Sequence, residues 1–183
     1  MQIRPLHLDD LNQIKIFTDK TIGENYFNPE ELKECYQKSL LNGVMYSFVL
    51  VDENNKIQGL RLAYPPGAWS KGKGSKLRPE LWKVPQEKAG YFQSLFISSE
   101  VQGAGWGPKL SEASISRLKE IGTEAIITHA WQESPNNSSI RYLTKFGFKP
   151  IATHPNYWID VDYTCVRDGK PCRCTAVEMI KYL

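Results

Sequence analysis

One glycine-rich segment has residue types and spacing suited to binding an anion. Residues 102–107 read Q-G-A-G-W-G and follow an apolar run at residues 91–97. Glycines let a backbone approach a ligand closely and adopt positive φ angles. Residues 108–121 have the apolar spacing of a helix, and the first N–H groups of a helix are unpaired and partly positive. The pattern predicts a cradle for a pyrophosphate, with a merely flexible strand-to-helix turn as the alternative.

Two common phosphate-binding motifs do not fit this segment. The dinucleotide fingerprint G-x-G-x-x-G fails, because its sixth position is Pro108 counted from Gly103 and Leu110 counted from Gly105. The Walker pattern fails because no Gly-Lys-Ser/Thr follows. The segment does resemble the Q/R-x-x-G-x-G/A signature of the GNAT superfamily of N-acetyltransferases, through Gln102, Gly105 and Gly107.

A second segment strengthens this resemblance. Residues 136–148 are similar to the family pattern N-x-x-A-x-x-x-Y-x-x-x-G-F through Asn136, Gly147 and Phe148, with Ser139 in place of alanine. Leu143 occupies the tyrosine position of that pattern, which is a departure from the family. The order of expected strands and helices also matches the family over nearly the whole chain.

Those elements are expected from the hydrophobic pattern and from turn residues. The expected strands are residues 2–6, 44–52, 56–63, 91–97, 124–130, 148–153, 157–166 and 172–182. Helices are expected to begin after residues 9–10 and at residues 29, 108 and 134. This mixture predicts an α/β domain with a mixed sheet. The resemblance specifies the GNAT fold: six to seven strands with splayed central parallel strands, flanked by about four helices, in one domain over residues 1–183.

The resemblance implies that acetyl-CoA binds as cosubstrate between the strands at residues 91–97 and 124–130. A bulge in the first strand leaves backbone groups unpaired there. The Leu95 N–H is then expected to face the acetyl carbonyl, and Ile97 to pair with the pantetheine amides. Further contacts are expected from the glycine segment to the pyrophosphate, and from the second segment to the pantetheine. The expected cofactor-binding residues are Leu95, Phe96, Ile97, Gln102, Gly103, Ala104, Gly105, Trp106, Gly107, Asn136 and Ser139.

The implied chemistry is direct acetyl transfer in a ternary complex, in which a base deprotonates the acceptor amine. Tyr142 is the candidate acid for the leaving thiolate, although it lies one residue, or about 100° of helix rotation, from the family position. The alternative for Tyr142 is an interfacial aromatic. His129 and Glu24 are candidate bases, and Glu133 is a weaker one. The alternative for His129 is a sheet histidine whose hydrogen bonds are satisfied within the fold. The alternative for Glu24 is a solvated acid on a loop.

The insertion at residues 68–89 is basic. It holds six lysines and arginines against two glutamates, together with two tryptophans. Such a loop is suited to attract an acidic or phosphorylated acceptor. Its Trp69 and Trp82 are suited to stack on an aromatic acceptor or to close a lid over the site. The alternative is a mobile, solvated loop. The basic residues are Lys71, Lys73, Lys76, Arg78, Lys83 and Lys88.

Three of the four cysteines gather near the C-terminus: Cys165, Cys172 and Cys174. A two-residue turn at residues 168–169 would place the first two directly opposite each other and the third on the same face. A zinc site needs a fourth ligand, and neither Cys35 nor His154 is obviously placed. We therefore expect reduced packing thiols and no metal, with a cross-strand disulfide or zinc as alternatives.

Composition excludes several function classes. The 183 residues are 41% hydrophobic and 23% charged, which is typical of a globular domain. The net charge of +3 does not by itself argue for nucleic acid, and no apolar run approaches a membrane span. Without a signal peptide, the cysteines favour a reducing cytoplasmic location.

We expect an amine acceptor on a small molecule or peptide, no nucleic-acid or membrane partner, and a monomer or homodimer. The alternatives are a non-catalytic acyl-CoA-binding regulatory domain and a nucleotide-binding module with the same glycine cradle.

Overall fold

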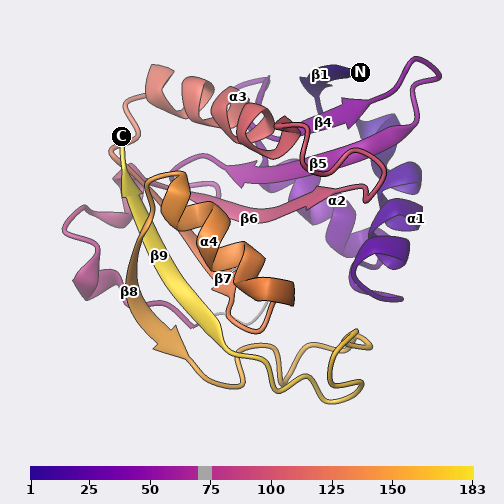
Figure 1. Cartoon of the computed structure of the whole chain (residues 1–183). Helices are drawn as coiled ribbons and strands as arrows, with labels where there is room; N and C mark the ends of the chain where they lie inside the picture. Colours follow the sequence, from indigo (N-terminus) through magenta and orange to yellow (C-terminus); the bar gives the residue numbers. More distant parts are fainter. Residues whose placement is uncertain (70–75) are drawn as a thin grey trace.

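Apolar, β-branched runs form the strands of one mixed sheet, and amphipathic segments form the helices beside it (Figure 1). The computed structural model describes residues 1–69 and 76–183. The sheet strands are β1 (Gln2–Pro5), β4 (Phe48–Val51), β5 (Ile57–Tyr64), β6 (Ala89–Ile97), β7 (Ala125–Trp131), β8 (Lys149–His154) and β9 (Ala176–Tyr182). A small separate pair consists of β2 (Leu40–Leu41) and β3 (Val44–Met45). The helices are α1 (Leu11–Thr21), α2 (Pro29–Lys38), α3 (Trp106–Glu120) and α4 (Ser138–Lys145).

The seven sheet strands lie in the order β1-β4-β5-β6-β7-β9-β8. Only the central pair, β6 and β7, is parallel, and the other neighbours are antiparallel. A parallel pair needs a crossover connection, which α3 supplies. β1 and β8 are the outer strands, and β8 changes register on β9 between Pro150 and Ala152. The expected GNAT fold, with parallel central strands and about four helices, is confirmed.

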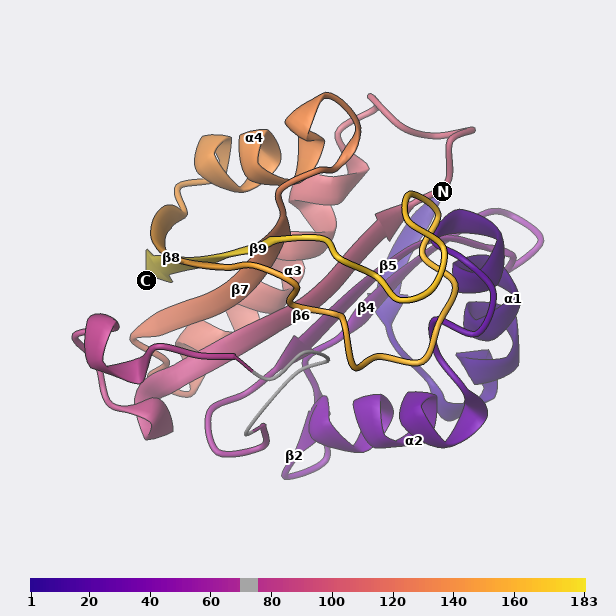
Figure 2. The ribbon, with the colours of Figure 1, turned by 90° about the horizontal axis from the view of Figure 1, so that it is seen from below.

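Helices cover both faces of the sheet. Figure 2 shows α1 and α2 on one face and α3 and α4 on the other. The larger core, which includes Ile14, Phe27 and Tyr91, lies on the face of α1 and α2. A second core, which includes Phe92 and Phe148, lies on the face of α3 and α4. The sheet is therefore buried on both faces around its centre.

The start of α2 fixes the loop that leads into it. The Asn28 side chain accepts a hydrogen bond from the Glu31 N–H (2.8 Å), and the Glu31 carboxylate accepts one from the Asn28 N–H (2.9 Å). This reciprocal capping box confirms the helix start expected at Pro29 and satisfies two backbone donors.

The strand expected at residues 157–166 is wrong. Within the described chain, residues 155–175 form an irregular loop between β8 and β9, with one isolated bridge between Cys165 and Gly169. The segment has strand-like composition because Tyr157 and Tyr163 are buried aromatics. Their rings pack against the core while the backbone stays outside a ladder, so strand propensity here reflects burial.

The insertion at residues 68–89 packs onto the sheet where the structure describes it. Trp69 and Trp82 are 3% and 0% exposed and belong to the larger core. The expectation that these indoles stack on an acceptor or close a lid is therefore wrong. Lys71 and Lys73 of the basic stretch lie outside the described residues. No helix in the described parts of the chain is long and apolar enough to cross a membrane.

Candidate active site

The two central strands separate midway along the sheet. β6 and β7 pair only as far as Phe92 and Thr128. Beyond these residues β6 stays paired with β5 as far as Ile97, and β7 stays paired with β9 as far as Trp131. Each strand therefore keeps its outer neighbour and turns an unpaired edge toward the other. Unpaired backbone edges are ready to bind an extended ligand as an added strand.

A bulge in β6 lies at the point of separation. Leu62 of β5 pairs with Ser94, and Ala63 pairs with Phe92, so Gln93 is the extra residue. A bulge bends its strand and interrupts the ladder, as expected from the resemblance. The buried Gln93 Oε1 has no hydrogen-bond partner among residues 1–69 and 76–183. The separation therefore starts at a defined irregularity in the backbone.

Beyond the bulge, the backbone of β6 presents alternate groups to the gap. The Ser98 N–H donates to the Gln58 carbonyl on the β5 side (2.9 Å). Because neighbouring N–H groups of a strand point in opposite directions, Leu95 and Ile97 direct theirs away from β5, toward β7. The Ile97 carbonyl also faces away from β5 and accepts from the Gln102 side chain (3.1 Å). The side chain of Phe96 packs near Tyr26 on the α1 face.

The glycine segment forms the turn between β6 and α3. Gly103 and Gly105 have φ angles of 81° and 78°, and Gly105 is the residue that caps α3. An added Cβ would meet nothing within 4 Å at either position. Glycine is therefore favoured here by its positive φ angle and not by lack of room, and the space next to the backbone is open. Residues 102–105 are exposed. The Lys109 ammonium lies over the Trp106 ring (4.5 Å) and adds a positive charge to the first turn. An exposed helix N-terminus with a nearby cation suits a pyrophosphate.

The second family segment lies on the opposite side of the gap, after β7. The Ser139 hydroxyl accepts from the Trp131 N–H at the end of β7 (3.2 Å), and the Ser139 N–H donates to the Ser134 hydroxyl (3.0 Å). Asn136 is exposed and has a φ of 53°, in the left-handed region where asparagine is tolerated. Ser139 therefore anchors the start of α4 to the separated strand.

The Tyr142 ring lies beside the β6 edge. A Cβ added at Gly107 would be 3.4 Å from Leu95 and 3.7 Å from the Tyr142 ring, so these three residues are close neighbours. Leu143, at the family tyrosine position, is 5% exposed and belongs to the core that includes Phe92. The one-residue offset therefore buries the leucine and leaves the tyrosine half-buried near the gap.

A buried hydrogen-bond network supports the Tyr142 hydroxyl. That hydroxyl lies 2.8 Å from the Ser111 hydroxyl, which also accepts from two nitrogens of Arg61 (2.7 and 3.2 Å). Arg61 is 2% exposed, and no carboxylate in the described chain pairs with it. Burial lowers the pKa of Arg61 to about 10, so it stays charged at neutral pH. The sequence analysis did not single out Ser111 or Arg61. The signal that could have found Arg61 is its position as one charged residue inside the apolar run of β5.

His129 is enclosed, with both ring nitrogens engaged. Its Nε2 lies 2.9 Å from the Lys76 carbonyl, which only accepts, so Nε2 donates and Nδ1 accepts from the Tyr91 hydroxyl (2.8 Å). Burial, together with His154, lowers the pKa of His129 to about 3. The imidazole is therefore neutral, and it must break a hydrogen bond before it can accept a proton from a substrate.

The other candidate bases differ in exposure. Glu24 is exposed in the loop between α1 and α2, next to Gly23, where an added Cβ would lie 2.5 Å from the Thr164 carbonyl. The α1–α2 loop and the β8–β9 loop therefore touch. Both oxygens of Glu133 accept from the Thr175 N–H (2.9 and 3.1 Å), which commits that carboxylate to the start of β9.

Aromatic side chains line the contact between these two loops. The Tyr26 ring lies edge-on to Tyr163 of the β8–β9 loop (5.3 Å) and to Phe96 of β6 (6.0 Å). These residues come from three distant parts of the chain, and the sequence analysis did not single out Tyr26 or Tyr163. Their shared burial next to the end of β6 is visible only in the folded chain.

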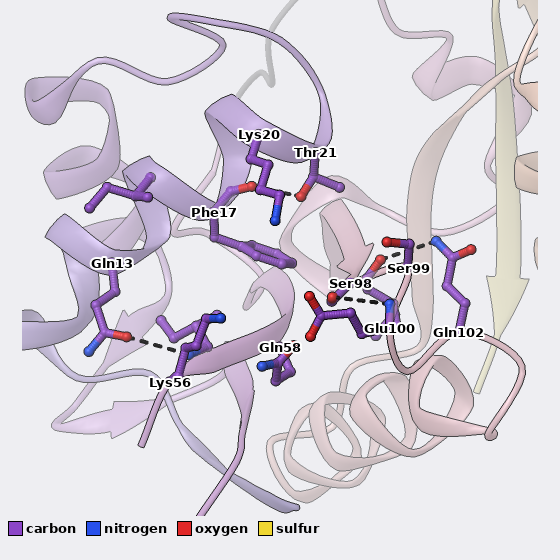
Figure 3. A pocket seen from close by; sticks show the side chains of 13 residues that line it. Gln13, Phe17, Lys20, Thr21, Lys56, Gln58, Ser98, Ser99, Glu100 and Gln102 are labelled. Carbon is purple, nitrogen blue, oxygen red and sulfur yellow. Dashed lines mark hydrogen bonds between the residues drawn. The ribbon is translucent and has the colours of Figure 1, made fainter. Parts of the chain in front are cut away.

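A separate hollow of about 410 Å³ lies beside the end of β6. Figure 3 shows side chains of α1, including Phe17 and Lys20, on one side and residues 98–102 on the other. Ile97 is the β6 residue that lines it, two positions or roughly 7 Å along the strand from Leu95. The hollow, which Gln102 also lines, therefore borders the end of β6 and the glycine segment and not the strand position next to Tyr142.

Comparisons with known proteins agree with this geometry. The family model for the acetyltransferase (GNAT) family matches residues 14–148, which is most of the chain. The chain belongs to this family. It is an acetyltransferase by family membership.

Solved structures show the same fold at low sequence identity. The Arabidopsis thaliana protein NAA60, in complex with acetyl-CoA, has a TM-score of 0.70 and 12% identity, with 100% of this chain and 98% of that chain covered. A phosphinothricin acetyltransferase from Sinorhizobium meliloti, in complex with AcCoA, has a TM-score of 0.68 and 18% identity, covering 100% and 88%. A ribosomal-protein-alanine N-acetyltransferase from Brucella melitensis has a TM-score of 0.67 and 17% identity, covering 100% of both chains. No curated protein matches the sequence.

Proposed function

We propose that this protein transfers the acetyl group of acetyl-CoA to a primary amine of a small molecule or peptide, directly and within a ternary complex. One observation carries the proposal. The unpaired edge of β6 beyond Phe92 leads, through a turn at residues 98–102, to the glycines at the start of α3. An extended pantetheine fits the first and a pyrophosphate fits the second.

The backbone of β6 supplies the polar contacts in this arrangement. The Ile97 N–H pairs with a pantetheine amide, and the Leu95 N–H donates to the acetyl carbonyl. As the amine attacks, negative charge grows on that carbonyl oxygen. A fixed backbone donor aimed at such an oxyanion contributes about 2.7–4 kcal/mol to the transition state. The bulge at Gln93 is what turns these groups into the gap.

Tyr142 is the proposed acid for the departing CoA thiolate. Arg61 can only donate, so it occupies lone pairs of the Ser111 oxygen, and the single Ser111 proton then points to the Tyr142 oxygen. This order leaves the phenolic proton of Tyr142 free for the sulfur. Its ring already lies beside Leu95, where the thioester is placed.

The acceptor is proposed to enter from the α1 face, between the α1–α2 loop and the β8–β9 loop. Tyr26, Phe96 and Tyr163 form its aromatic wall, and Glu24 is the candidate base on the exposed loop. The relatives' names include a small-molecule acceptor and a protein alanine, so the proposal covers both classes. The cytoplasmic location, the absence of nucleic-acid and membrane partners, and a monomeric or homodimeric state are proposed from the sequence alone.

Calorimetric titration with acetyl-CoA, CoA, ATP and NAD is the first test. We expect selective binding of acetyl-CoA and CoA. A screen of primary amines and N-terminal peptides, with the released thiol as readout, then identifies the acceptor. Intersecting initial-velocity lines support direct transfer, whereas parallel lines would indicate a covalent intermediate. Tight binding of acetyl-CoA without turnover on any amine would favour a regulatory acyl-CoA-binding domain instead.

A further inference from the structure

Three cysteines and one aspartate converge in the loop between β8 and β9. One ligand-type atom from each lies within 4.8 Å of the others. The Cys165 and Cys174 sulfurs are 3.9 Å apart, and the Cys174 sulfur is 3.3 Å from a carboxylate oxygen of Asp168. All three cysteines are buried and none forms a disulfide. The four residues of this cluster are Cys165, Asp168, Cys172 and Cys174.

A tight turn brings these residues together. Cys165 and Gly169 exchange two backbone hydrogen bonds of 3.0 and 2.9 Å. This register differs from the expected two-residue turn at residues 168–169, and it places Asp168 inside the turn. Cys172 and Cys174 lie in the segment that leads into β9, and their side chains meet Cys165 and Asp168. The turn thus supplies the fourth ligand that neither Cys35 nor His154 offered in the sequence.

We propose that Cys165, Asp168, Cys172 and Cys174 bind one Zn²⁺ ion as a structural site. Thiolates with a carboxylate are a donor set that zinc accepts in tetrahedral geometry, with Zn–S bonds of about 2.3 Å. The edge of such a tetrahedron is about 3.8 Å between two sulfurs and about 3.5 Å between sulfur and oxygen. The observed separations of 3.9 and 3.3 Å match those edges. Four protein ligands leave no open position, so the site stabilises structure and performs no catalysis.

One cationic side chain lies beside the cluster. The Arg167 guanidinium is 3.9 Å from the Cys174 sulfur and 3.7 Å from Asp168. It offsets part of the negative charge that three thiolates and a carboxylate bring together.

A disulfide fits this cluster less well. A disulfide needs two sulfurs about 2.05 Å apart and would leave the third cysteine without a partner. The aspartate next to the sulfurs has no role in such a bond, whereas it completes the four ligands of a metal.

A second group of potential ligands does not form a comparable site. Glu178 is fully buried between His129 and His154. Its carboxylate already accepts from the Trp82 indole (2.6 Å), from the Arg78 N–H and from His154 (2.7 Å). His129 donates to the Lys76 carbonyl, as described above. Protein partners therefore fill the positions that a metal would need.

The zinc ion would fix one wall of the proposed acceptor entrance. The Tyr163 hydroxyl donates to the Cys172 sulfur (3.2 Å), and its ring packs against Tyr26. The neighbouring Thr164 carbonyl lies against Gly23 of the α1–α2 loop. Loss of the ion is expected to loosen this loop while the glycine segment at the start of α3 stays intact.

Metal content of the purified protein tests the proposal directly. Protein expressed with zinc and purified without chelator is expected to hold about one zinc per chain by elemental analysis. Replacement by Co²⁺ is expected to give the visible bands of tetrahedral cobalt together with thiolate charge-transfer absorption. A zinc content near zero, with four free thiols titrated in the native protein, would overturn the proposal, as would a disulfide found by mass spectrometry.

Variants separate the site from a general effect on folding. Cys172→Ser and Asp168→Ala are expected to lower zinc affinity at least about tenfold, because each removes one ligand. Asp168→Cys restores four thiol ligands and is expected to keep the zinc with stronger cobalt charge-transfer absorption. Cys35→Ser, a buried cysteine on α2, is the matched control and is expected to keep about one zinc. Equal zinc content in all four variants would overturn the assignment. Calorimetric binding of acetyl-CoA reports separately on the proposed active site.

Discussion

At the scale of single residues, the most unusual group is the buried Arg61. Its guanidinium lies over the Phe92 ring (4.2 Å) but has no carboxylate partner in the described chain, so its place beneath Ser111 and Tyr142 suggests a benefit elsewhere. Orienting a phenolic proton toward a thiolate is such a benefit. The network would also hold the ring that borders Leu95 in one position.

Tyr142→Phe tests this role. The variant keeps the ring and removes the proton, so kcat is expected to fall about a hundredfold while the Kd for acetyl-CoA stays unchanged. Tyr182→Phe is the control, because it removes a hydroxyl that bonds the Trp82 carbonyl far from the gap. Wild-type turnover of Tyr142→Phe at every pH would remove Tyr142 from the acid role.

Gly105→Glu tests the anion cradle. The side chain would add bulk and negative charge at the start of α3 and should abolish CoA binding in calorimetry. Gly43→Glu is the matched control. Gly43 has a φ of 77° and, like Gly105, open space around an added Cβ. It lies in the turn between β2 and β3, away from the start of α3. Both variants carry the same backbone strain. Equal CoA affinity of the two folded variants would contradict the placement of the pyrophosphate.

His129 predicts a dependence of stability on pH. Its pKa of about 3 in the folded chain lies below the unfolded value, so the unfolded chain binds the proton first as pH falls. The stability conferred by neutral His129 is therefore full above about pH 6.5 and declines toward pH 3, by about 2 kcal/mol between pH 7 and pH 5. Urea unfolding at both values should show a smaller difference for His129→Gln. The same difference in both proteins would contradict the assignment.

At the scale of elements, the regular parts could be predicted and the loops could not. The strand–glycine–helix order around residues 91–121 is local, so spacing alone predicted those three parts, whereas the separation of the central strands was implied by the resemblance to the GNAT family. The β8–β9 loop was misread as a strand because Tyr157 and Tyr163 are buried without joining a ladder. The aromatic wall could not be predicted, since Tyr26 and Tyr163 meet only after folding.

The loop at residues 76–89 depends on one buried carboxylate. Glu178→Ala is expected to destabilise the fold by about 3–5 kcal/mol, because it leaves the Trp82 indole, the Arg78 N–H and His154 without their acceptor. Glu124→Ala, an exposed acid that is 3.8 Å from Lys88, should stay within about 0.5 kcal/mol of wild type. Urea unfolding measures both. A loss below about 1 kcal/mol for Glu178→Ala would mean that water replaces the carboxylate.

At the scale of the whole molecule, the proposed cofactor site lies between the two halves of the sheet. Below the separation, β6 and β7 pair directly, whereas beyond it no ladder joins them in the described chain, so a ligand bound there is expected to bridge them. Acetyl-CoA at one hundred times its Kd is expected to stabilise the fold by about 2.7 kcal/mol, which raises Tm by about 5–10 °C. Calorimetric melting with acetyl-CoA and with ATP compares the two ligands. An equal rise with ATP would favour a general nucleotide site.

The outer strand β8 sets a limit on how copies of this chain can associate. Pro150 has no N–H to offer to a further strand, and the change of register beside it bends the strand. At the opposite end of the sheet, β1 finishes at Pro5. A fibre or dimer built by continuing the sheet from one molecule into the next is therefore disfavoured at both ends. Assembly through the helix-covered faces or the loops is favoured instead, and it would leave the seven-stranded sheet closed to further strands at both ends.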